Sequence, residues 1–243
     1  MPWFPVKYKP DMLEIIASST PFDYSKLESE SEVIPQYSFH GSKIENLSSK
    51  AVLTVGDRAF EGCTEMRFIN LPNCTSVGQY AFSCGRTTYA DSIDVYLPSV
   101  VTIGAYAFNN FKGTDSTADL IFNSCTYVGQ NAFAHTSASP LTVRSFQFPA
   151  VQTFGGSAMS RVIAETVDIG ENCTSLGSSP LANATITNLI VRAADPPTLG
   201  SSAGLGTGAT ITHIYVPSGS VSTYKSANRW SAYASIIEAI PSN

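Results

Sequence analysis

The sequence contains little charge and no cluster of positive charge. Asp, Glu, Lys and Arg make up 14% of its 243 residues, and 14 basic residues against 19 acidic ones leave a net charge of −5. Ordinary globular proteins carry roughly 25% charged residues. A surface that binds nucleic-acid phosphates or an anionic membrane needs clustered Lys and Arg. We therefore expect no nucleic-acid or membrane-surface partner, and the polar, weakly charged surface suits a protein exposed outside cells.

Long hydrophobic segments are missing as well. No apolar run approaches the roughly 18 residues that a membrane-spanning helix needs, so membrane insertion is not expected. The first ten residues hold three prolines and two lysines and lack the apolar stretch of a secretory signal. The usual export route is thus not visible in this sequence.

Metal-ligating residues are few and scattered. Only three His occur, at 40, 135 and 213, and five Cys is an odd number, whereas a zinc site needs ligands that lie close in space. Three of the thiols occupy a repeat position at which Val100 and Val151 stand in sister repeats, which indicates buried structural cysteines. These are Cys74, Cys125 and Cys173. We expect no metal and no cofactor.

A catalytic site is not indicated either. His135 with nearby Ser137 and Asp115 could be drawn as a hydrolase constellation. Ser is abundant in this chain, however, and no nucleophile-elbow motif is present. We therefore expect a protein without enzymatic activity.

A six-residue pattern recurs along the chain: an apolar residue, Gly, two variable residues, Ala and Phe. Its clear copies are Val55–Phe60, Val77–Phe82, Ile103–Phe108 and Val128–Phe133. Weaker copies end at residues 39, 159, 181 and 204, so that successive copies are 21 to 26 residues apart. Periods of this size indicate a solenoid of stacked repeats.

A short segment that alternates apolar and polar residues precedes each copy. Examples are Ile93–Leu97 and Phe146–Phe148, and Pro follows such segments at 72, 98, 149 and 217. Alternation closed by Pro is typical of a strand that must stop, because Pro has no N–H to donate to a sheet. We expect each repeat to contain one strand and one turn.

The fold class follows from stacking these repeats. The Gly of the pattern either takes a backbone angle denied to other residues or lets a neighbouring coil pack close, while Ala and Phe supply core residues in a short helical turn. One repeat cannot bury its Phe alone. We predict about eight repeats with capped ends, with short parallel strands forming a sheet on one face, short helical turns opposite, and a column of Phe inside.

The pattern, a following Cys and a Leu-Pro strand end together resemble the BspA-like leucine-rich repeat family. The segments that carry the resemblance are Val55–Cys63, Leu71–Pro72, Val77–Cys84, Leu97–Pro98 and Ile103–Phe108. The resemblance implies a leucine-rich-repeat solenoid and a non-enzymatic surface or interaction protein of bacteria. Similar repeat proteins occur in bacteriophages of gut bacteria.

The resemblance leaves two settings open. Family members on bacterial surfaces are generally exported by a signal sequence, and none is visible here, so we expect a bacteriophage virion component, associated with the capsid or the tail. Its partners would be other virion proteins or a glycan or protein of the host surface. The alternative is a bacterial cell-surface adhesin.

The chain ends lie outside the repeats. We expect an N-terminal arm and cap at residues 1–32, the solenoid at 33–217 and a C-terminal cap at 218–243, in which Ser220 caps a short helix and Trp230 packs against the array. The aromatic residues of the first ten positions are candidates for a docking arm that inserts into a neighbouring subunit, as in a homo-oligomer, and the alternative is a cap on the first coil. The docking-arm residues are Trp3, Phe4 and Tyr8.

Three inserts, at residues 85–91, 111–117 and 135–140, fall at the same phase of the repeat. Such inserts project from one edge, so we expect them to form a ridge beside the sheet, and the alternative is that surface loops tolerate drift. Apolar residues at outward strand positions exceed what solvation requires. The predicted binding residues of ridge and exposed sheet are Arg86, Tyr89, Tyr96, Lys112, Asp115, Ile121 and His135.

Overall fold

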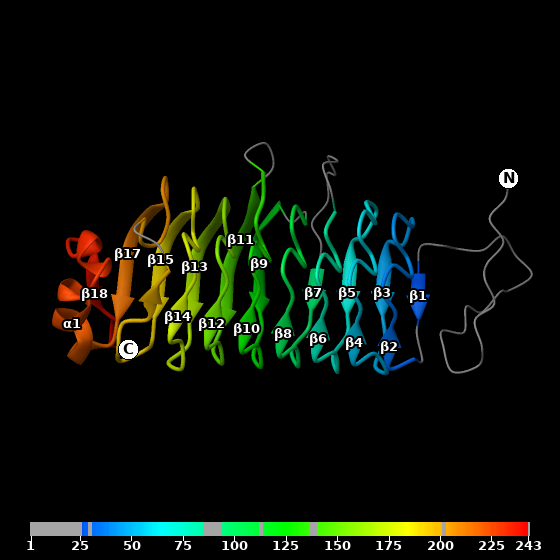
Figure 1. Ribbon diagram of the computed structural model, residues 1–243, viewed down its shortest axis with the longest axis horizontal. Helices are drawn as coiled ribbons and strands as arrows, with labels where there is room; N and C mark the ends of the chain where they lie inside the picture. Colours follow the sequence, from blue (N-terminus) through cyan, green and yellow to red (C-terminus); the bar gives the residue numbers. More distant parts are fainter. Residues whose placement is uncertain are drawn as a thin grey trace, which may run out of the picture.

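The computed structural model describes residues 26–28, 31–84, 94–111, 114–136, 140–200 and 203–242. These residues wind into one elongated solenoid, whose coils stack from β1 (Lys26–Glu28) at one end to α1 (Val221–Ser226) and β18 (Ile237–Ala239) at the other (Figure 1). The described strands pair in parallel between successive coils. The predicted parallel-strand solenoid of about eight repeats is confirmed.

One side of the solenoid is a sheet of two-residue strands, one from each coil. Within the described residues this sheet has eight strands. They are β2 (Val33–Ile34), β4 (Thr54–Val55), β6 (Ser76–Val77), β8 (Thr102–Ile103), β10 (Tyr127–Val128), β12 (Thr153–Phe154), β14 (Ser175–Leu176) and β16 (Thr198–Leu199).

The other side is formed by longer strands in two successive sheets, and we call its outward surface the long-strand face. The first sheet contains β1, β3 (Asn46–Ser48), β5 (Phe68–Asn70) and β7 (Asp94–Tyr96). The second contains β9 (Thr114–Ile121), β11 (Leu141–Phe148), β13 (Val162–Ile169), β15 (Thr185–Val191), β17 (Thr210–Val216) and β18.

Each repeat thus contains two strands where the sequence predicted one. The second strand includes the apolar residue that opens the repeated pattern, such as Val55, which is fully buried. A hydrogen bond joins each coil to the previous one at this point, as where Gly56 N donates to Ile34 O at 2.8 Å. Two residues are too few to show an alternating pattern in a sequence, and therefore only the longer strand was predicted.

The turn after each two-residue strand bonds to itself and to the next coil. Ala59 N donates to Gly56 O at 3.3 Å within the turn, whereas Phe60 N donates to Ala81 O of the next coil at 2.8 Å. The segment is therefore a hydrogen-bonded turn rather than the short helical turn that was predicted. The inter-coil bonds fix the spacing at which the core residues stack.

The predicted Phe column lies in the core. Ring centroids are 5.2 Å apart for Phe39 and Phe60, and 5.3 Å apart for each later pair up to Phe133. Phe108 is fully buried, and Phe39 in the first coil is partly buried. Met159 and Leu181 continue the column as buried residues in the following coils.

The glycine of the pattern serves close packing. A Cβ added at Gly104 would lie 2.6 Å from the carbonyl carbon of Gly78 and 2.7 Å from Gln79 N, which is closer than real Cβ contacts allow. Positive φ occurs instead at the second variable residue, as in Tyr106 with φ 58°. Of the two roles that the sequence left open for Gly, the structure shows the approach of the neighbouring coil.

The second insert is not a projecting loop throughout. Residues 114–117 form the first half of β9, where Thr114 pairs with Thr142 and Asp115 with Val143 of β11. The prediction of a loop over these residues is wrong, because the adjacent coil offers them a strand to pair with. Residues 85–93, 112–113 and 137–139 lie outside the described residues.

The C-terminal segment covers the last coil. It consists of η1 (Ser218–Ser220), α1, η2 (Trp230–Tyr233) and β18. Trp230 is 1% exposed, and its Nε1 donates to the Pro197 carbonyl at 2.8 Å, while the Tyr224 hydroxyl donates to the Ala193 carbonyl at 2.8 Å. Ser220 makes no side-chain capping hydrogen bond, so its predicted capping role is wrong. The contacts of the aromatic residues hold the cap in place.

Candidate binding surface

Two columns of side chains run along the long-strand face at the outward strand positions. In the first coils, Phe68 pairs with Asp94, and Asn70 pairs with Tyr96. Later registers place Ser145 beside Thr166 and Gln147 beside Asp168. The registers therefore align equivalent strand positions of successive coils, although Ser145 itself is only 6% exposed.

Apolar side chains are exposed on this face. Tyr96 on β7 is 56% exposed, and Ile121 on β9 is 40% exposed. Phe68, Ile190 and Tyr215 occupy other positions of the columns and are intermediate in exposure. Exposed apolar side chains of this kind offer surface that a binding partner can bury from water.

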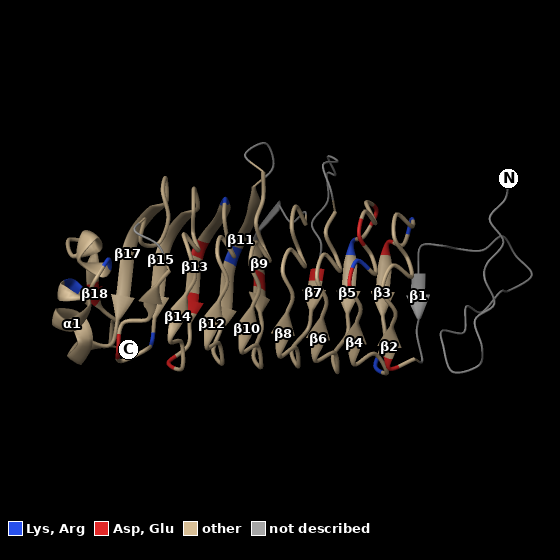
Figure 2. Cartoon of the chain, viewed as in Figure 1, with Lys and Arg blue, Asp and Glu red and all other residues tan. Residues whose placement is uncertain are grey.

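Charged groups on the same face are paired between coils. Figure 2 shows acidic residues on β9 and β13 and a basic residue on β11. Arg144 donates hydrogen bonds from Nε and Nη2 to the two carboxylate oxygens of Asp119, and the distance from Nε to Oδ1 is 2.8 Å. Arg192 makes the same bidentate contact with Asp168, with Nε 2.8 Å from Oδ1 and Nη2 2.7 Å from Oδ2. These fork-like pairs fix the side chains and compensate each other's charge.

The Asp119 carboxylate accepts hydrogen bonds from two residues of the next coil, Arg144 and Ser145. The Arg144 guanidinium and, to a lesser degree, the Ser145 hydroxyl that donates to Oδ1 at 2.7 Å hold the pKa of Asp119 below its usual range. The carboxylate is therefore ionised at neutral pH. Asp94, one coil earlier, is exposed, so the face presents an acidic residue beside Tyr96.

The predicted ridge is only partly described, and one of its residues is misplaced. His135 is 5% exposed and its N–H donates to Ser160 O at 3.0 Å, so the prediction of an exposed binding residue is wrong. The inter-coil bonding extends beyond Phe133 at this point and turns His135 inward. Asp115 lies in β9, and nothing is described of its side chain. The remaining predicted residues, Arg86, Tyr89, Lys112, Trp3, Phe4 and Tyr8, lie outside the described residues.

A second surface, not among the predicted binding residues, lies at the turns that follow the two-residue strands. The second variable residue of the pattern is Tyr37, Arg58, Tyr80 and Tyr106 in the first four copies, and we call these four residues the turn ladder. The guanidinium carbon of Arg58 lies 4.4 Å from the Tyr80 ring centroid and 6.0 Å from that of Tyr37. The rings of Tyr80 and Tyr106 are stacked at 4.6 Å. Aligning the copies by their Gly would have found this column.

The backbone of the turn ladder is in the left-handed region. Its φ angles are 58°, 55°, 55° and 58°, and the same position holds Asn131, Ser157 and Ser179 at 53°, 52° and 51° in later coils. For a residue with a large side chain this conformation costs about 1–2 kcal/mol. Stacking of two aromatic rings stabilises the fold by about 0.5–1.5 kcal/mol, which offsets only part of this cost. Tyr37 is exposed and the other three residues are intermediate in exposure, so bulky side chains at this left-handed position need a reason beyond closing the turn.

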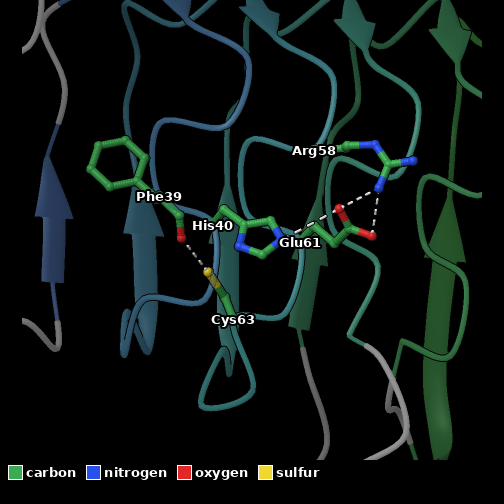
Figure 3. A network of polar contacts seen from close by, with 5 residues as sticks. All are labelled: Phe39, His40, Arg58, Glu61 and Cys63. Carbon is green, nitrogen blue, oxygen red and sulfur yellow. Dashed lines mark hydrogen bonds and ion pairs between the residues drawn. The ribbon is translucent and has the colours of Figure 1, made fainter.

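Polar contacts hold the centre of the turn ladder in place. Figure 3 shows Arg58 and His40 directed at the same carboxylate, that of Glu61. Nη1 of Arg58 donates to both oxygens, at 2.8 and 3.1 Å, and His40 Nε2 lies 3.6 Å from Oε2. The Cys63 thiol nearby donates to the Phe39 carbonyl at 3.0 Å. Arg58 is thereby fixed between the two tyrosines.

The cysteines are buried and free. Burial raises the pKa of Cys74 to about 11 and those of Cys84, Cys125 and Cys173 to about 12. Thiols with such values are protonated at neutral pH and weak nucleophiles. Their positions in the core agree with the structural role that the sequence indicated.

The part of the chain that the structure describes contains no group of three or more His, Cys, Asp or Glu that could hold a metal ion. In the same residues, no helix is long and apolar enough to cross a membrane.

The match to a family model agrees with this repeat architecture. The family model for the BspA type leucine rich repeat region matches residues 32–145 and 101–229, and the chain belongs to this family. A crystal structure of a leucine-rich repeat protein from Bacteroides ovatus is similar at 18% identity and a TM-score of 0.38, covering 79% of this chain and 60% of that one. The chain thus spans about 60% of that protein's length. No curated protein matches it.

Proposed function

We propose that this protein is a non-enzymatic binding scaffold that holds a protein partner on its long-strand face. The observation that carries the proposal is the exposure of Tyr96 and Ile121 on a rigid sheet whose charged neighbours are paired. A solenoid keeps such side chains ordered before binding, so less conformational entropy is lost on association. Solenoids of the leucine-rich repeat type are typically interaction proteins rather than enzymes, which supports the same reading.

Two settings fit a scaffold of this kind. Membership of the BspA-type family favours a bacterial surface, and a bacteriophage virion is the second setting. A fixed copy number in purified phage particles would place the protein in a virion, whereas release by protease treatment of intact cells would place it on a bacterial surface. Absence of the protein from both phage particles and the cell surface would contradict both settings.

Site-specific photocrosslinking tests the binding face. A photoreactive phenylalanine analogue replaces Tyr96 in one variant and Tyr127, which is 43% exposed on β10 of the opposite side, in the matched control. After irradiation in the organism that makes the protein, we expect a discrete protein adduct from position 96 and none from position 127. Equal adduct patterns from the two positions would overturn the assignment.

A pair of substitutions provides the second arm of the test. Tyr96→Ser and Ile121→Ser remove exposed apolar surface and should change folding stability by less than about 0.5 kcal/mol. We expect the double variant to lose the adduct when the probe is placed at Phe68, in the column that continues to Asp94. Retention of the adduct would show that the partner binds elsewhere.

A further inference from the structure

The turn ladder is a surface that the proposed function does not use. It lies at the turns between the two sides of the solenoid, in the copies ending at residues 39, 60, 82 and 108. Tyr37 is 55% exposed, and the Arg58 side chain is 37% exposed although it is anchored by Glu61. Later coils place Asn or Ser at the same position. Bulky flat side chains are therefore confined to the end of the solenoid nearest to β1.

We propose that the turn ladder binds residues 1–10 of the same chain. These residues read Met-Pro-Trp-Phe-Pro-Val-Lys-Tyr-Lys-Pro and contain the spacing Pro2-x-x-Pro5. Segments with this spacing favour the polyproline II conformation and bind surfaces lined with aromatic side chains. A row of three tyrosines with a stacked guanidinium is such a surface.

The charges of the two parts are complementary. The only charged residues among the first ten are Lys7 and Lys9. Beside the ladder lie Asp57, which is exposed, and Glu61, whose carboxylate accepts hydrogen bonds from Arg58 Nη1 and lies 3.6 Å from His40 Nε2. Lysines that follow the proline motif can therefore pair with carboxylates while the prolines and Trp3 pack on the rings.

The length of the connecting segment permits binding within one chain. β1 begins at Lys26 and pairs with β3 through Asn46, in the part of the solenoid that carries the ladder. Fifteen residues separate Pro10 from Lys26, and an extended segment of that length reaches roughly 50 Å. Three steps between neighbouring coils amount to only about 15 Å. A tether of this reach also gives the arm a high effective concentration at its own ladder.

Crosslinking in the full-length protein tests this proposal. A photoreactive phenylalanine analogue replaces Phe4, and the irradiated purified protein is analysed by gel electrophoresis and peptide mass spectrometry. We expect a crosslinked monomer, with the crosslink mapped to the segments that carry Tyr37, Tyr80 or Tyr106. A crosslinked dimer would instead assign the arm to a second copy, and crosslinks elsewhere or none at all would also overturn the proposal.

Substitutions in the turn ladder test, in the same crosslinking experiment, whether the ladder is the docking surface. Tyr80→Asn and Arg58→Asn keep a residue that tolerates the left-handed backbone, as Asn131 does in a later coil. We expect each to lower the crosslink yield at least tenfold with an unchanged circular dichroism spectrum, and Pro2→Ala with Pro5→Ala to act likewise from the side of the arm. The matched control Tyr127→Asn, on β10, should leave the yield unchanged. Equal yields from the ladder variants and the control would exclude the ladder as the docking surface.

Discussion

At the scale of single residues, each position of the repeated pattern has its own physical task. The apolar residue and Phe fill the core, Ala leaves room beside Phe, and Gly allows the next backbone to approach. Gly56, Gly78 and Gly104 stand in one column, in which a Cβ on any of them would meet backbone atoms of the preceding coil at 2.6 to 2.9 Å. The close stacking of turns therefore depends on this column.

A glycine substitution tests the close approach. Gly104→Ala should destabilise the protein by about 3 kcal/mol, because the added methyl group overlaps main-chain atoms that cannot move without breaking inter-coil bonds. Gly219→Ala is the matched control, since a Cβ there meets nothing within 4 Å. Urea unfolding midpoints would measure both. Equal midpoints for the two variants would contradict the packing role of Gly104.

The Phe column gives a second prediction at this scale. Phe108→Ala should cost about 3–5 kcal/mol, since the ring is fully buried between Phe82 and Phe133. Phe39→Ala should cost much less, because Phe39 is partly buried and stacks on Phe60 at the end of the column. Denaturant midpoints of the two variants compare them directly. A similar loss in both would argue against the column as the main source of stability.

Residue roles in the core were predictable from the sequence, whereas backbone conformations were not. Recurrence at a fixed period was enough to place Phe60, Phe82 and Phe108 in one column. The left-handed backbone of Arg58 depends on its N–H donating to Gln79 O at 2.8 Å in the next coil, and no local sequence signal marks such a bond. Aligning the copies by their Gly places the four turn-ladder residues in one column, but the left-handed backbone at these positions is seen only in the structure.

At the scale of elements, neighbouring coils decide where strands begin. β9 starts at Thr114 although its sequence suggested a loop, because β11 offers it a pairing partner. The same extension of inter-coil contact buries His135. The outward positions of Tyr96 and Ile121, at the ends of β7 and β9, followed directly from alternation, whereas the start of β9 did not.

The C-terminal cap gives a prediction at the element scale. Tyr224→Phe removes the hydroxyl that donates to the Ala193 carbonyl inside the core and leaves that acceptor without its partner. We expect a loss of about 1–3 kcal/mol in the free energy of unfolding. Tyr127→Phe is the control, because Tyr127 is exposed. Thermal and urea unfolding would compare the two, and an unchanged midpoint for Tyr224→Phe would mean that the cap does not depend on this bond.

At the scale of the whole molecule, the protein is a one-dimensional array. Within each sheet, every described strand except those at the sheet edges pairs with strands of the coils before and after it, so stability is close to a sum of repeat and neighbour contributions. The cap at one end blocks further stacking there. Such an array presents long, fixed surfaces on its sides, which is why the two binding proposals concern different sides of the same rigid body.

A change in coil number tests this picture. Removing residues 155–176 joins Phe154 of β12 to Gly177, which follows β14 in the same phase of the repeat. We expect a folded protein with one coil fewer, shortened by about 4.8 Å along its axis and with a urea m-value reduced in proportion to its size. Small-angle scattering and urea unfolding would measure both. Removing residues 155–165 alone is the matched control: it joins the two-residue strand to the middle of β13, out of phase, and should prevent cooperative folding. If both deletions fold equally well, the repeat phase does not determine the fold.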